Sequence, residues 1–340
     1  MEKSYARIRL DSSQYFPGNT ITGEAMFYFR SPKEFRKIRI RLRCHEHTHW
    51  TKTHRHHNSG TRRNQTVTHH YNGDNDILLL DNYILDQGSL PSGTHVFPIR
   101  FQLPLNIPSS FVGEWGYIKY SIKITVDLPM RFDIEDTMVF NVIAPIIMPI
   151  FLMPTTISGE RSICCCFCRE GTIQLQVSLN RTTFVVGETE NIRIYCSNLT
   201  NVQITSVEVK LKQKLLYNTT QPCDSRFTSK IINTLQNAGV GANGENTYHV
   251  AFQVPNIMIP NFASCMLFRS FYTLKVVAYI SGCHQKLEAI CHVNVIHQNT
   301  QNEPVCSQPM PSSLPSISIP SDNLPSYEEA TGNSEKHLQM

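Results

Sequence analysis

The chain has 340 residues, 41% hydrophobic and 17% charged, which is enough apolar mass for about two domains of roughly 150 residues. This composition excludes a wholly disordered, collagen-like or coiled-coil protein. The net charge of +4 is too small to indicate nucleic acid as a partner. The charged residues 1–7 lack the apolar run of a secretory signal, and the eleven cysteines are odd in number. We therefore expect a cytoplasmic protein with reduced thiols and without a cofactor.

Apolar and polar residues alternate at every second position along much of the chain, which predicts half-buried strands. Residues 38–43 alternate Ile and Leu with Arg, and residues 118–126 alternate Ile, Tyr and Val with Lys, Ser and Thr. No long stretch shows the 3.6-residue period of an amphipathic helix. Short strands separated by turn residues indicate an all-β protein built from sandwiches.

The sequence also contains an internal repeat, because blocks in its first half match blocks in its second half. Residues 14–21 align with residues 183–190, and both segments carry an aromatic residue shortly before Gly and Thr. Later in each copy, Phe-Gln-Leu-Pro at 101–104 matches Phe-Gln-Val-Pro at 252–255. The distance along the chain between matching residues is smaller for the second pair of blocks than for the first pair. The first copy must therefore contain an insertion between its two blocks.

These repeats divide the chain into two tandem sandwiches and a tail. We expect the first sandwich over residues 1–150, a linker with a cysteine cluster over 151–170, and the second sandwich over 171–298. The insertion in the first copy coincides with the His-rich residues 45–76. The Pro- and Ser-rich residues 299–340 contain one aromatic side chain, too little apolar surface to offset ordering entropy, and are predicted to be disordered.

Several blocks of the sequence resemble the α-arrestins, the arrestin domain-containing proteins. They are Tyr15–Gly18 with Gly23, Phe97–Pro104, Pro108–Gly113, Tyr117–Tyr120, Cys164–Cys168, Phe184–Gly187 and Leu324–Ala330. The resemblance implies two arrestin-like, immunoglobulin-type β-sandwiches and a non-enzymatic adaptor. It further implies that membrane receptors or transporters are bound as cargo and linked to WW-domain HECT-type ubiquitin ligases. Ubiquitination, endocytosis and endosomal sorting would follow, with recruitment to the plasma membrane and endosomes.

The tail contains a candidate WW-binding motif at Leu324, Pro325 and Tyr327. WW domains bind a polyproline II segment in an aromatic-lined groove, and Pro325 favours that backbone. The usual motif of the family is Pro-Pro-x-Tyr, so Leu324 replaces the first proline. Leucine keeps an apolar contact but loses preorganisation, and we expect weaker binding than the family motif gives.

Basic residues alternate with the expected core residues on corresponding strands of the two sandwiches. They are Arg39, Arg41 and Arg43 in the first and Lys210, Lys212 and Lys214 in the second. One interpretation is a cationic face that contacts acidic cargo or an anionic membrane surface. The other is an ordinary solvated sheet face.

Histidines are concentrated in the insertion of the first sandwich. Eight of the 14 lie there: His45, His47, His49, His54, His56, His57, His69 and His70. A solvated loop, a metal site and an acid-sensing patch are all compatible with this composition. The sequence shows no carboxylate or cysteine cluster of fitting spacing in the insertion, so we expect a loop and assign no metal.

The cysteine cluster comprises Cys164, Cys165, Cys166 and Cys168. It makes a single Cys-x-x-Cys without a second pair at zinc-ribbon spacing. Packing, palmitoylation and redox sensitivity remain open as its role. Two alternatives to the ligase adaptor also remain, a receptor-desensitising arrestin and a metal- or redox-linked regulator that uses the His or Cys clusters.

Overall fold

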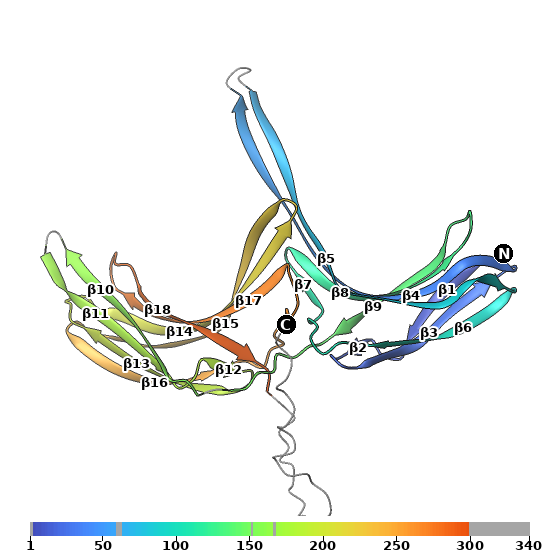
Figure 1. The fold of residues 1–340 in the computed structure, drawn as a ribbon. Helices are drawn as coiled ribbons and strands as arrows, with labels where there is room; N and C mark the ends of the chain where they lie inside the picture. The colour runs from blue at the N-terminus through green and yellow to red at the C-terminus, as the bar shows by residue number, and fades with distance from the viewer. Residues whose placement is uncertain (1–2, 59–62, 151, 166–167, 299–340) are drawn as a thin grey trace, which may run out of the picture. The chain divides into compact units, whose positions relative to one another are not determined.

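The computed structural model describes residues 3–58, 63–150, 152–165 and 168–298. Within these ranges the chain is all-β, with 18 strands and no helix (Figure 1). It follows that no described helix is long and apolar enough to cross a membrane. The expected disordered tail, including the motif at 324–327, lies outside the described residues.

Nine strands in two sheets form the first sandwich. In chain order they are β1 (Tyr5–Leu10), β2 (Gln14–Tyr15), β3 (Thr20–Phe29), β4 (Lys33–Asn58), β5 (Arg63–Leu90), β6 (Gly93–Gln102), β7 (Phe111–Gly113), β8 (Gly116–Asp127) and β9 (Ile134–Val142). One sheet has the order β1-β3-β6, and the other has the order β2-β9-β8-β4-β5 with β7 paired to β8.

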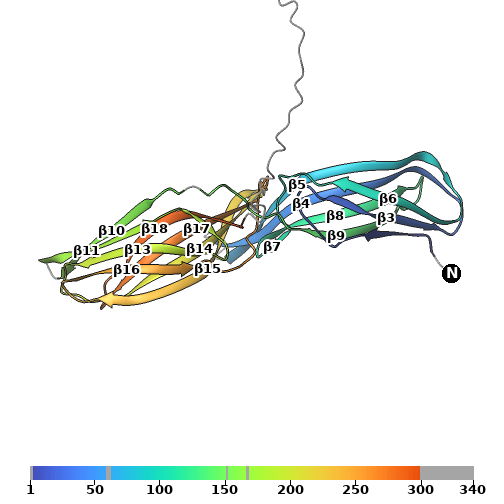
Figure 2. The same cartoon turned by 90° about the horizontal axis from the view of Figure 1, so that it is seen from below.

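Nine further strands form the second sandwich. They are β10 (Thr155–Cys165), β11 (Cys168–Leu179), β12 (Thr183–Val185), β13 (Thr189–Asn198), β14 (Ile204–Thr220), β15 (Cys223–Val240), β16 (Gly244–Gln253), β17 (Phe268–Ile280) and β18 (Leu287–Ile296). Their sheets have the orders β10-β11-β13-β16 and β12-β18-β17-β14-β15 (Figures 1 and 2). The prediction of two tandem β-sandwiches is confirmed.

The alternating residues form the cores as the sequence predicts. Ile38, Ile40 and Leu42 of β4 and Ile122 of β8 are fully buried. Each such aliphatic side chain stabilises the fold by about 1.5–3 kcal/mol relative to an exposed position. The second sandwich has its own core, formed by the equivalent strands.

The repeated Gly and Gln residues have the same structural role in both copies. Gly18 and Gly187 adopt φ values of +81° and +85°, which favour glycine. The side-chain amide of Gln102 donates to the carbonyl of Gly18 at 2.5 Å, and that of Gln253 donates to the carbonyl of Gly187 at 3.0 Å. The repeated sequence blocks therefore hold the turn before β3 and β13 against the end of β6 and β16.

Two parts of the sequence prediction differ from the structure. Most of the expected linker at 151–170 is strand, because β10 and the start of β11 pair as a hairpin in the second sandwich. The His-rich insertion is not a loop but the continuation of β4 and β5 into one long hairpin (Figure 1). Its strands carry polar residues on both faces, so the hydrophobic alternation that identifies a half-buried strand is missing there.

Candidate functional site

A buried carboxylate joins the two sandwiches. Glu46 of β4 is fully buried. Its Oε1 accepts hydrogen bonds from the backbone N–H of Met266 at 2.9 Å and from the amide of Asn75 at 2.7 Å. Its Oε2 accepts from the backbone N–H of Leu267 at 3.1 Å. Because a buried charge is tolerated only when it is hydrogen-bonded, this arrangement fixes β4 against the segment that leads into β17.

The outer parts of two hairpins, β4–β5 and β14–β15, extend this contact. The hydroxyl of Thr48 donates to the carbonyl of Asn218 at 2.6 Å, and the indole N–H of Trp50 donates to Asp224 at 2.9 Å. Lys52 forms an ion pair with the same aspartate. The hydrogen bond from Lys52, with a smaller one from Trp50, lowers the pKa of Asp224 below its usual value.

The Pro-Ser-Ser block shared with the α-arrestins lies at the same junction. Ser109 donates its backbone N–H to the carbonyl of Asn261 at 2.9 Å, and its hydroxyl lies 3.1 Å from the backbone nitrogen of Ala144, which donates to it. The phenol of Tyr120 donates to the carbonyl of Pro108 at 2.7 Å. The block therefore fixes the route of the chain between the sandwiches rather than forming an exposed site.

The arginines of β4 share one face of the sheet, as the sequence indicates, but acidic residues of β5 lie beside them. Arg41 makes a bidentate contact with Asp81, with N···O distances of 2.7 and 2.8 Å. Arg39 lies 4.0 Å from the same aspartate, and Arg43 lies 2.6 Å from Asp76. The hydrogen bond from Arg41 lowers the pKa of Asp81. Two aspartates thus lie among the three arginines, and this face is not a uniformly cationic surface.

The lysines of β14 also have neighbours. Lys210 forms an ion pair with Glu208, whose pKa is lowered mainly by the hydrogen bond from this lysine. Lys212 is half-buried and follows a β-bulge in the pairing with β15. The ammonium of Lys214 lies 3.7 Å from the ring centre of Phe227, within the range of a cation–π interaction.

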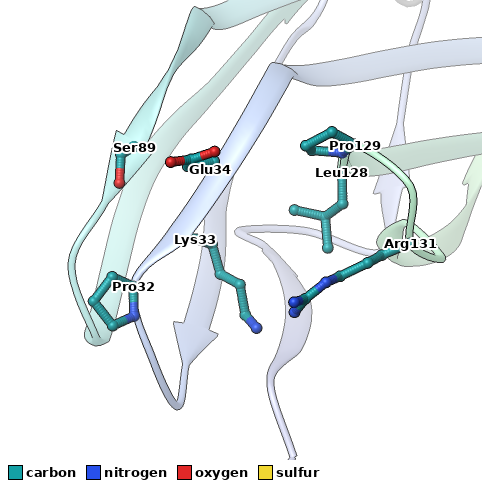
Figure 3. A pocket seen from close by; sticks show the side chains of 7 residues that line it. All are labelled: Pro32, Lys33, Glu34, Ser89, Leu128, Pro129 and Arg131. Carbon is teal, nitrogen blue, oxygen red and sulfur yellow. The ribbon is translucent and has the colours of Figure 1, made fainter.

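An exposed loop between β8 and β9 combines apolar and basic side chains. Met130 and Phe132 are fully exposed. Beside them is a hollow of about 340 Å³. Figure 3 shows Lys33 and Arg131 extending into it from two sides. The rest of its lining is Pro32, Glu34, Ser89, Leu128 and Pro129. Basic groups next to exposed apolar side chains suit a surface that is both anionic and apolar.

Of the cysteine cluster, Cys164 and Cys165 end β10 and Cys168 begins β11. The backbones of Cys165 and Cys168 are paired in the antiparallel register. Cys166 lies outside the described residues, and palmitoylation of the cluster stays a prediction. Elsewhere, burial raises the pKa of the Cys44 thiol to about 12 and that of Cys196 to about 11. These two buried thiols are poorly suited to redox chemistry, which requires the thiolate.

The sequence analysis missed three features of the functional regions described above. Glu46 looks like any polar residue of an alternating strand, and only its burial shows its role. Asp74 and Asp76 lie far from His47 and His45 in the sequence, but the β4–β5 register places them directly opposite these two histidines. The complete exposure of Met130 and Phe132 in the 128–133 loop could have been suspected because these two residues flank an arginine.

Two tandem β-sandwiches whose strands correspond in order apart from β7 and β10, joined through a buried polar contact, define a protein of the arrestin class. The chain matches the family model "Arrestin (or S-antigen), N-terminal domain" over residues 6–148 and the model "Arrestin (or S-antigen), C-terminal domain" over residues 169–300. It therefore belongs to the arrestin family, and its relatives among the arrestin domain-containing proteins place it with the α-arrestins.

The relatives are similar at modest identity. The chain is 27% identical to arrestin domain-containing protein 1 of Homo sapiens over 198 residues, which cover 57% of this chain and 45% of that protein. It is 24% identical to arrestin domain-containing protein 17 of Caenorhabditis elegans over 200 residues, covering 55% and 46%. The chain thus matches less than half the length of these relatives. Proteins of this family are in general non-enzymatic adaptors.

Proposed function

We propose that this protein is a trafficking adaptor that binds membrane cargo and recruits a WW-domain HECT-type ubiquitin ligase. Membership of the arrestin family supports the adaptor role. The observation that carries the ligase role is the sequence Leu324-Pro325-Ser326-Tyr327. Ubiquitination of the cargo, endocytosis and endosomal sorting are the consequences of this proposal, with the protein moving from the cytoplasm to the plasma membrane and endosomes.

The two sandwiches supply what an adaptor needs from its folded part. The hydrogen bonds of Glu46 and Ser109 connect them through buried groups, so a cargo contact on one sandwich is held in a fixed relation to the other. Tyr327 is the only aromatic residue after residue 298 and is the natural anchor for a WW pocket.

A membrane contact through the 128–133 loop belongs to the same proposal. Asp76 and Asp81 offset part of the charge of the three arginines of β4, so these arginines are a weaker choice for anionic lipid than the loop. There, Met130 and Phe132 can enter the apolar region while Arg131 stays among the headgroups.

Proximity labelling of the full chain in cells tests the ligase role. The wild-type protein should label HECT-type ligases with WW domains, and Tyr327→Ala should lose them. Ser326→Ala is the matched control, because the third position of the motif does not fill a pocket, and it should label the same ligases as the wild type. Identical labelling by the wild type and Tyr327→Ala would contradict the proposal. If the protein bound its cargo only when the cargo tail was phosphorylated, the result would favour a receptor-desensitising arrestin.

A further inference from the structure

Two histidines and an aspartate bring three metal-binding atoms together on the outer face of the β4–β5 hairpin. The Nδ1 of His47 lies 2.7 Å from Oδ1 of Asp74, and the Nε2 of His45 lies 3.2 Å from the same oxygen. One ligand atom from each residue lies within 4.8 Å of the other two. The ligand atoms of a tetrahedral zinc ion are about 3.3 Å apart, given bonds of about 2.0–2.2 Å. Small side-chain rotations therefore suffice to place one ion among them.

A second carboxylate orients one of these histidines. Oδ1 of Asp76 lies 2.8 Å from Nδ1 of His45, the ring nitrogen that faces away from Asp74. When Nε2 binds a metal ion, Nδ1 carries the proton and donates it to Asp76, which is the arrangement that commonly supports metal-bound histidines. Arg43 donates from Nε to the same carboxylate at 2.6 Å and holds it in place.

One of the two basic groups beside the cluster also contacts a proposed ligand. Arg43 is paired with Asp76, and its Nη2 lies 3.0 Å from Nδ1 of His45, the ring nitrogen that is not offered to the metal ion. Lys119 of β8 lies opposite His45 in the register, but its ammonium lies 4.0 Å from the ring centre of Tyr117. The Tyr117 ring in turn packs against His47, with 5.2 Å between the ring centres, and forms one wall of the cluster. Two carboxylates thus offset the two cations, and the imidazoles face a site open to solvent.

The accessibility of the ligands suits an ion that enters from solution. The side chain of Asp74 is 57% exposed, whereas those of His45 and His47 are 16% and 27% exposed. The histidines are held by packing and the aspartate is free to close over an ion. Imidazole nitrogens select zinc and its neighbours over Mg²⁺ and Ca²⁺, which prefer oxygen ligands.

We propose that His45 Nε2, His47 Nδ1 and Asp74 form a Zn²⁺ site, with a water molecule at the fourth position. The site would strengthen the pairing of β4 with β5 at the place where the same strands support the contact between the sandwiches. Glu46 lies between the two histidines and Asn75 follows Asp74, and the hydrogen bond between them lies on the opposite, inner face. A zinc ion on the outer face would therefore strengthen the same two strands whose inner face carries the Glu46 contact between the sandwiches. This inference does not depend on the ligase role.

Calorimetric titration of the full, reduced chain with Zn²⁺ tests the site. Other histidines and cysteines of the chain can bind zinc, so the comparison is between matched variants. Asp74→Asn and His47→Gln should each either abolish the binding of one zinc ion per chain or weaken its affinity at least tenfold. Asp76→Asn should still bind this zinc ion, but with an affinity about 10- to 100-fold lower, as expected when a supporting carboxylate is lost. His49→Gln, two residues further along β4 and outside the cluster, should bind as the wild type does.

Co²⁺ in place of zinc identifies the ligands. The difference between the wild-type and Asp74→Asn spectra should be that of four-coordinate cobalt without a thiolate charge-transfer band. Equal zinc uptake and affinity in the wild type and Asp74→Asn would overturn the proposal, as would a cobalt spectrum from thiolate ligands alone. Circular dichroism of the metal-free variants checks their folding, and His47→Gln decides the matter if Asp74→Asn does not fold.

Discussion

The carboxylate of Glu46 and the backbone N–H of Leu267 meet at 3.1 Å, although 221 residues separate them in the chain. The contact is buried and is reinforced by Met266 and Asn75, which donate to the same carboxylate. A single side chain of the first sandwich thus satisfies two consecutive backbone donors of the second. Substituting Glu46 should therefore weaken the contact between the two sandwiches.

Replacing Glu46 by alanine should destabilise the protein. Three donors lose their acceptor, one of them the buried N–H of Leu267, and an unsatisfied buried group costs about 1–3 kcal/mol. We expect the free energy of unfolding of the first sandwich to fall by about 3 kcal/mol. Urea denaturation followed by tryptophan fluorescence measures it, because Trp50 and Trp115 both lie in that sandwich. Glu24→Ala, on an exposed position of β3, should change it by less than about 0.5 kcal/mol. Equal losses in both variants would contradict the role of Glu46.

The pair of Arg41 and Asp81 should make stability depend on pH in the acid range. The hydrogen bond from Arg41 lowers the folded-state pKa of Asp81 below the ordinary value of 3.8. A lowered carboxylate pKa contributes stability that is present above pH 3.8 and is lost as the pH falls through the folded-state value. Asp81→Asn should therefore be less stable than the wild type at pH 7, by about 1 kcal/mol for a partly exposed pair.

The difference between the wild type and Asp81→Asn should disappear in acid. Denaturation curves at a series of pH values measure this difference, and Arg41→Gln should behave in the same way because it removes the other partner. A difference that stays constant from neutral pH down to well below 3.8 would show that the ion pair is not its cause.

The 128–133 loop should bind anionic membranes. Replacing Met130 and Phe132 by serine removes the two apolar side chains that would enter the lipid, each able to contribute about 1.5–3 kcal/mol when fully buried. We expect at least about tenfold weaker binding to phosphatidylserine vesicles in sedimentation assays, since partial burial gives part of this energy. Leu105→Ser, at another exposed apolar residue, should bind as the wild type does. The same loss in both variants would exclude a specific role of the loop.

Basic residues beside the loop should add a salt-dependent component. Lys33→Gln combined with Arg131→Gln should weaken vesicle binding at low salt by about 1 kcal/mol per charge. The effect should shrink as salt screens the surface potential. Vesicles of phosphatidylcholine alone should show no difference between this variant and the wild type. A salt-independent loss would contradict an electrostatic contact.

Restoring the family motif should strengthen binding of the tail to WW domains. A peptide of residues 319–331 is expected to bind a single WW domain with a Kd on the order of tens of micromolar, about −6 kcal/mol. Leu324→Pro should improve this by about 0.4–1 kcal/mol, because proline restricts the free peptide to the extended backbone. Isothermal titration measures the change. Weaker binding of Leu324→Pro than of the wild-type peptide would show that Leu324 makes a contact of its own.

Features that depend on local pattern could be predicted from the amino-acid sequence. Alternation with a period of two decides which side of a strand faces the core, so Ile38, Ile40 and Ile122 could be assigned to the core before any fold was known. The repeated blocks around Gly18 and Gly187 indicated two related sandwiches, because their turns need the same residues in both copies. The family resemblance rests on the same blocks.

Which polar groups meet depends on the folded arrangement of the strands. His45 and Asp76 are 31 residues apart, and their contact depends on the register of β4 against β5 and on a bulge at Cys44. A shift of that register by one residue would turn the aspartates to the other face and separate them from the histidines. The partners of Glu46 lie even further away in the chain. Registers and buried contacts between sandwiches are set by the packing of the whole fold, and no local pattern in the sequence specifies them.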